Sequence, residues 1–271
     1  MSRLKAIAAA GAAIAACLAL GVHAADAQKF EYQPSEAVVK NPNPSFAALN
    51  AVPIGQIVVE RSDGSGPRAK LAKTNWRNTR IVVVYDAQVG APEALEYESL
   101  VQIGVVREEG FLNRRWGVPL PSGWTIWCES ADSERCAKAL ADVLYFYRFR
   151  LRGMREADRL FGEALAKYKD PASRPPLPED VRKFKIQAEF AVDQKKLDDA
   201  INYYTQGVIA ARWWADGYFN LALLHAERKN FHEAIRVMKR FIALQEGTPD
   251  ARRAMDMTYR WEAMIPADQR E

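Results

Sequence analysis

The clearest pattern in the chain is a repetition of apolar and small positions at a fixed distance along the sequence, which we call the repeat interval. When residues 181–214 are shifted by 34 positions, they fall on residues 215–248. Large apolar residues then meet large ones and alanines meet alanines, in seven pairs: Phe184 with Tyr218, Ala188 with Ala222, Leu197 with Phe231, Ala200 with Ala234, Ile201 with Ile235, Tyr204 with Met238, and Val208 with Ile242. Small residues let two helices approach closely while large ones fill the space beside them, so each stretch is predicted to be a helical hairpin.

The two stretches resemble the tetratricopeptide repeat, whose length is the same as the repeat interval. Asn220-Leu221-Ala222 is similar to the first-helix signature of that family, and Asn230 to Ala234 resembles its turn into the second helix. The resemblance implies a stack of hairpins whose concave face is built mostly from first helices. On that face it implies a mixed basic and apolar strip for a protein or peptide partner, made of these candidate residues: Arg182, Lys185, Phe219, Leu223, Met257 and Arg260.

The segments that flank the two repeats are predicted to complete the stack. Residues 151–170 resemble the second helix of a degenerate copy, with Gly153 as the turn before it, and residues 171–180 form a Pro-rich linker. Residues 249–266 are predicted to be a helix that covers the last apolar face, because a repeat stack needs a closing element.

The middle of the chain, residues 76–150, is predicted to be a small antiparallel β domain closed by a helix. Its β-branched and aromatic runs indicate strands over four ranges: 79–85, 97–106, 116–120 and 124–128. Helical periodicity follows over residues 136–151. Several strands followed by one closing helix resemble the pleckstrin-homology-like arrangement, so the whole chain is predicted to be an α+β protein with a β domain before an all-α stack.

The N-terminal residues have the layout of a secretory signal peptide over residues 1–27. Arg3 and Lys5 precede an uncharged run that ends in small residues, and that run is shorter than the roughly 20 residues a membrane span requires. The chain is therefore expected in the bacterial periplasm or outside the cell, and on a membrane only if Cys17 is lipidated. Residues 28–75, where only 57–59 suggests a strand, are expected to be an extended or mobile arm.

The charge balance argues against nucleic acid as a partner. Removal of residues 1–27 leaves 36 basic and 33 acidic side chains, a difference too small to attract a polyanion. The cysteines that remain, Cys128 and Cys136, are expected to face one core. There they form either a disulfide or two small buried residues, and the sequence leaves both alternatives open.

No catalytic, metal-binding or cofactor-binding motif is recognisable. The histidines after residue 27, His225 and His232, fall in the second repeat and lack the partners that a zinc site requires. The sequence therefore predicts an exported binding adaptor without cofactors. The alternative is a cell-envelope enzyme that uses the repeats as a docking arm, in which carboxylates of the β domain such as Glu96, Glu98 and Glu108 would have to act.

Overall fold

The computed structural model describes residues 30–77, 79–86, 90, 93–109, 114–121 and 123–270. An antiparallel sheet occupies the N-terminal half and a stack of helices the C-terminal half, so the predicted α+β class is confirmed. The chain divides into two compact units. The first includes the described residues up to Lys73, Val84–Pro92 and Ser99–Phe146, and the second includes Thr74–Val83, Glu93–Glu98 and the chain from Tyr147 onward. The predicted signal peptide, with Cys17, lies outside the described residues.

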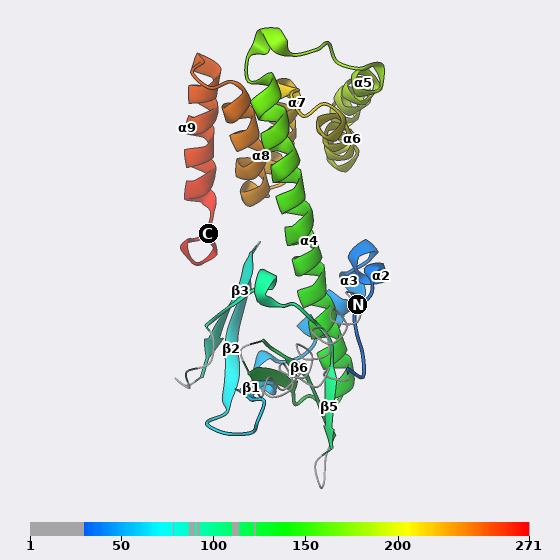
Figure 1. Cartoon of the computed structure of the whole chain (residues 1–271), viewed down its shortest axis with the longest axis vertical. Helices are drawn as coiled ribbons and strands as arrows, with labels where there is room; N and C mark the ends of the chain where they lie inside the picture. The colour runs from blue at the N-terminus through cyan, green and yellow to red at the C-terminus, as the bar shows by residue number, and fades with distance from the viewer. Residues whose placement is uncertain are drawn as a thin grey trace, which may run out of the picture. The chain divides into compact units, whose positions relative to one another are not determined.

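The described residues form seven strands in one sheet, in the order β4-β3-β2-β1-β7-β6-β5. Figure 1 labels five of them. The strands are β1 (Ile57–Arg61), β2 (Ala69–Trp76), β3 (Arg80–Tyr85), β4 (Ala94–Glu96), β5 (Val106–Glu109), β6 (Arg114–Pro119) and β7 (Trp124–Cys128). Every residue of β7 is buried, which means that both faces of the sheet are covered at its centre.

The segment expected to be an arm is folded, so that expectation is corrected for residues 30–75. It contains helices α2 (Glu36–Lys40) and α3 (Asn43–Asn50), the 3-10 turn η1 (Ile54–Gln56) and the first two strands. Strand β1, the one strand expected there, lies beside β7 with Val58 fully buried. The hydroxyls of Tyr32 and Ser45 donate hydrogen bonds to the buried carboxylate of Asp142, at 2.6 and 2.7 Å.

The strand predicted over residues 97–106 is wrong in most of its length. Tyr97–Ser99 is a 3-10 turn, η2, and strand structure is confined to residues before it and after Val105. The apolar side chains that suggested a strand are anchors of a buried loop, since Tyr97, Leu100 and Val105 are almost fully buried.

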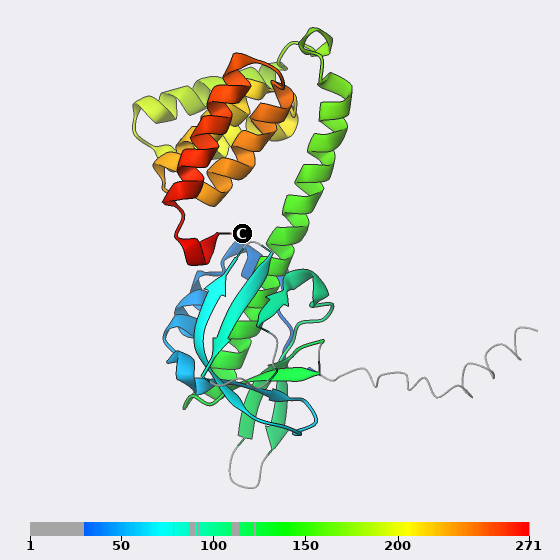
Figure 2. The ribbon, with the colours of Figure 1, turned by 90° about the vertical axis from the view of Figure 1, so that its left-hand side faces the viewer.

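Helix α4 (Ser133–Tyr168) runs without interruption through Gly153, where a turn was expected. A single glycine costs a helix only about 1 kcal/mol, and the helix-favouring residues around it outweigh that cost. The first part of α4 crosses one face of the strands (Figure 2). Cys136 of α4 forms a disulfide with Cys128 of β7, with 6.0 Å between the two Cα atoms.

The remaining helices pack around one apolar core in the second unit (Figure 1). They are α5 (Glu179–Asp193), α6 (Leu197–Ala210), α7 (Ala215–Glu227), α8 (Phe231–Leu244) and α9 (Pro249–Met264), followed by the 3-10 turn η4 (Ala267–Gln269). The predicted closing helix is thus present as α9. Within the part of the chain that the structure describes, no helix combines the length and apolar character needed to span a membrane.

The repeat interval recurs in the backbone at the end of each first helix. Lys195 and Lys229 have positive φ angles of 57° and 58°. After α5, the N–H groups of Lys195 and Lys196 donate to the carbonyls of Val192 and Ala191, both at 2.8 Å. The same two bonds close α7 one repeat later, at 2.8 and 2.9 Å. Both helices therefore end in the same Schellman motif, with lysine at the position that usually holds glycine.

Glycine at these two turns should stabilise the stack. An L-residue in the left-handed region is strained, so Lys195→Gly and Lys229→Gly should each raise the free energy of unfolding by about 0.5–1 kcal/mol, net of the backbone entropy of glycine. Lys183→Gly inside α5 is the matched control and should lower it by about 1 kcal/mol. Urea denaturation followed by circular dichroism measures the free energy of unfolding of all three variants. An equal loss of stability in the three would contradict the left-handed turn at Lys195 and Lys229.

Candidate partner-binding surface

The predicted strip lies on the three helices α5, α7 and α9, which begin the successive repeats. Lys185 and Phe219 are separated by one repeat interval, as are Leu223 and Met257. Arg182 and Arg260 are exposed and Lys185 is half-buried. The structure therefore leaves the basic members of the strip accessible on the first and last of these helices.

The apolar members of the strip are less accessible than predicted. Phe219, Leu223 and Met257 are half-buried and pack against the core of the stack. The ring of Phe219 lies 5.0 Å from that of Phe241 in α8, measured between centroids. Each side chain thus offers one edge to solvent, and a partner would meet a shallow apolar surface flanked by cations.

The charges along the strip are held by weak local pairs. Arg182 donates to Glu179 at 2.9 Å, and Lys185 lies 3.9 Å from Glu189. Pairs this exposed contribute about 0–1 kcal/mol, so a ligand carboxylate can displace them at low cost. Arg260 forms no ion pair among the described residues.

Trp214 fills the junction between the two repeats. It lies between α6 and α7 with 5 % of its surface exposed. A Cβ atom added at Gly207 or Gly217 would lie 2.6 or 2.4 Å from its ring. The two glycines are therefore the positions that admit the indole, and the strip depends on this junction because α5 and α7 lie on either side of it.

The last part of α4 packs on the second repeat. The ring of Phe161 meets that of Tyr218 edge to face at 5.5 Å, and Asp158 pairs with Arg240 at 2.5 Å. The outer face of α5, where a preceding repeat would pack, is open instead: Ile186 and Phe190 are 62 % and 64 % exposed.

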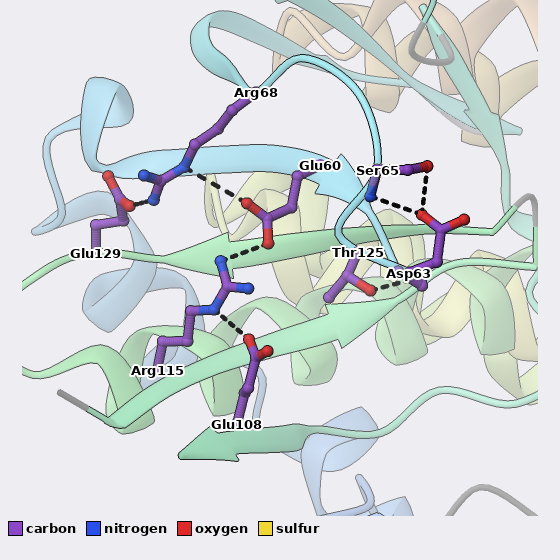
Figure 3. Close-up of polar contacts among 9 residues, drawn as sticks. Glu60, Asp63, Ser65, Arg68, Glu108, Arg115, Thr125 and Glu129 are labelled. Carbon is purple, nitrogen blue, oxygen red and sulfur yellow. Dashed lines mark hydrogen bonds and ion pairs between the residues drawn. The ribbon is translucent and has the colours of Figure 1, made fainter. Parts of the chain in front are cut away.

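The sheet of the first unit carries a chain of five alternating charges on one face (Figure 3). Arg68 pairs with Glu129 and with Glu60, and Arg115 pairs with Glu60 and with Glu108. The guanidinium of Arg115 also lies 4.2 Å above the ring centroid of Trp127 (only 6 % exposed). Both arginines are thus paired with glutamates, and Arg115 also covers the ring of Trp127.

Trp127 reaches this position because Gly117 faces it on the neighbouring strand. The two residues are directly paired in the register of β6 and β7, and a Cβ atom at Gly117 would lie 2.6 Å from the indole ring. The charged face is therefore a packed, internally paired surface.

The carboxylates of the enzyme alternative are all paired with arginines. Glu96 lies 3.3 Å from Arg80, Glu108 pairs with Arg115, and Glu98 pairs with Arg155. The hydrogen bond from Arg155 holds the pKa of Glu98 below its usual range, and the other resolved carboxyl pKa shifts among the described residues are also downward. A proton donor at neutral pH would need a shift in the opposite direction.

Among the described residues, neither His225 nor His232 belongs to a group of three or more potential metal ligands. His225 is half-buried in α7, where burial lowers the pKa of its imidazole, and His232 lies in the first turn of α8. The described residues contain no cluster of three or more potential metal ligands.

Sequence reasoning did not predict that apolar residues at the two ends of the stack are exposed. On α9, Met255 and Tyr259 are 40 % and 58 % exposed. The repeat register could have indicated them, because their equivalents in α7 are the buried Leu221 and the half-buried His225, which interacts with Glu233 of α8. Comparison of the chain with protein-family models, curated proteins and solved structures gives no match.

Proposed function

We propose that the chain is an exported adaptor that binds a protein partner through the strip of Arg182, Lys185, Phe219, Leu223, Met257 and Arg260. The observation that carries this proposal is the recurrence of helix ends, hydrogen bonds and left-handed lysines at the repeat interval. A regular stack of hairpins places equivalent residues of successive first helices side by side, and a continuous surface results.

The chemistry of the strip favours an extended peptide with acidic residues. Half-buried aromatic and aliphatic side chains supply apolar contacts along the middle of the surface. Arginine and lysine at its two ends can pair with carboxylates and set the register of the bound segment. Glu189, 3.9 Å from Lys185, stands where the terminal-carboxylate clamp of tetratricopeptide repeats has an asparagine, so we propose recognition of an internal segment.

Capture by the mature chain tests the proposal. The chain without residues 1–27 serves as bait in cell-envelope extract, with quantification of bound proteins by mass spectrometry. Simultaneous Arg182→Glu and Lys185→Glu should reduce the captured partner by about tenfold or more, which corresponds to about 1.4 kcal/mol. Both side chains are at the surface, so the fold should persist in circular dichroism.

The matched control is Lys183→Glu, on the same helix. At 100° per residue, Lys183 lies about 160° around α5 from Lys185, and it is exposed. This variant should capture as much partner as the unmodified chain. Equal capture by the strip variant and the control would contradict the proposed surface.

A further inference from the structure

Helix α9 is a first helix that has no second helix after it within the described residues. It begins at Pro249, one repeat interval after α7 begins at Ala215. After α9 the described chain forms only the short turn η4, where α7 is followed by α8. The face of α9 that corresponds to the α8-facing side of α7 is consequently uncovered.

Side chains on α9 indicate which face is open. Met255 and Tyr259 occupy the positions of Leu221 and His225 in α7. Leu221 is buried, and His225 interacts with Glu233 of α8. Met255 and Tyr259 are exposed instead, and no second helix packs over them within the described residues.

A second helix seated as in the complete repeats does not fit this face. Close approach there relies on Ala188 and Ala222, which are both fully buried. In α9 the same position holds Asp256, and such a helix would bury its carboxylate at a cost of several kcal/mol. Any partner that packs on α9 must therefore contact the side of the open face away from Asp256, with Asp256 at the edge of the contact.

That side of α9 is complementary to itself. Arg252, Met255, Tyr259 and Glu262 fall within an arc of about 80° at 100° per residue. Met255 and Tyr259 lie two residues on either side of Met257, and Arg252 and Glu262 lie five residues on either side of it. When two such helices cross antiparallel at this midpoint, each methionine faces a tyrosine and each arginine faces a glutamate.

The two charges are available for this use. Arg252 and Glu262 are exposed, and no ion pair is formed by either of them among the described residues. The neighbouring cation Arg253, by contrast, pairs with Asp250 at 2.6 Å. A two-fold axis through the contact would form the Arg252–Glu262 pair twice, as a symmetric interface requires.

We propose that α9 packs antiparallel against α9 of a second copy of this chain, with Met255 and Tyr259 at the centre of the contact. One helix pair buries less surface than a standard interface, so the dimer is weak, with dissociation in the micromolar range or above. Met257 lies on the opposite side of α9, so the contact leaves that residue of the partner-binding strip uncovered.

Sedimentation equilibrium of the mature chain, from about 1 to about 500 µM, measures the association expected of a weak interface. We expect a monomer–dimer equilibrium. Arg252→Glu and Glu262→Arg should each raise the dissociation constant by about tenfold or more, because like charges then face each other twice. An equal mixture of the two variants should form a heterodimer about as stable as the original, since both facing pairs again have opposite charges.

Lys183→Glu changes the net charge as Arg252→Glu does, but on α5, and should leave the equilibrium unchanged. The proposal is overturned if the chain remains monomeric over the whole concentration range. It is also overturned if dimers form that neither substitution weakens, or if the mixture associates no better than each variant alone.

Discussion

Replacement of Trp214 by alanine is expected to lower the free energy of unfolding of the helical stack by about 3–5 kcal/mol, the usual range for a buried aromatic residue. The indole fills the space between α6 and α7 and lies 5.7 Å from the ring of Tyr204. Gly207 and Gly217 face the indole and have no side chains that could relax into the cavity that remains. Urea denaturation of the mature chain, followed by circular dichroism, measures the loss.

A pair of glycine substitutions controls for general sensitivity of the helices. Gly217→Ala places a methyl group against the Trp214 ring and should cost about 1–3 kcal/mol as an overpacked site. Gly153→Ala lies in open space on α4 and should stabilise the helix by about 0.5–1 kcal/mol. If both changes act in the same direction, Trp214 does not hold the junction in the way described.

Loss of the disulfide should destabilise the first unit by about 2–3 kcal/mol. The cross-link spans a separation of 8 residues, and the chain-entropy estimate for a loop of that size is about 2.5 kcal/mol. Simultaneous Cys128→Ala and Cys136→Ala removes it while retaining small apolar side chains at two buried positions. Thermal unfolding with and without reductant measures the effect.

The reductant provides the control for this prediction. The unmodified chain should lose stability when reductant is added, whereas the double alanine variant should not respond to it. A chain whose unfolding is the same with and without reductant would show that the two cysteines do not form the bond.

The repeat could be predicted because its evidence is local and periodic. Matching residues such as Ala200 and Ala234 specify both the helices and their spacing, and the structure places helix ends at the same interval. The degree to which the apolar side chains of the strip are buried could not be predicted in the same way. The half-burial of Phe219 depends on Phe241, whose position follows from the packing of α8 rather than from the first-helix pattern.

The errors in the part of the chain before α5 come largely from contacts between distant segments. Strand β1 is central because it pairs with β7, which lies far along the chain, and no local pattern around Val58 reveals that partner. Tyr97 and Leu100 have strand-like spacing but serve as loop anchors. Gly153 resembles a turn signal, although the apolar and helix-favouring residues on both sides continue α4 through it.

The exposed face of α9 was missed for a related reason. Met255 and Tyr259 are large and mainly apolar, as core residues are, so a pattern of apolar positions predicts burial for them. Only the absence of a second helix after α9 within the described residues leaves them exposed. Repeat register and chain order together are needed to recognise such a surface.

Photo-crosslinking in the producing cell tests the adaptor proposal most directly. A benzophenone amino acid is introduced at Lys185 or Arg260 on the strip, and at Lys183 or Lys239 as controls on other faces. The proposal predicts one discrete adduct with another envelope protein from both strip positions and none from the controls. No adduct from the strip, or the same adduct from all four positions, would contradict it.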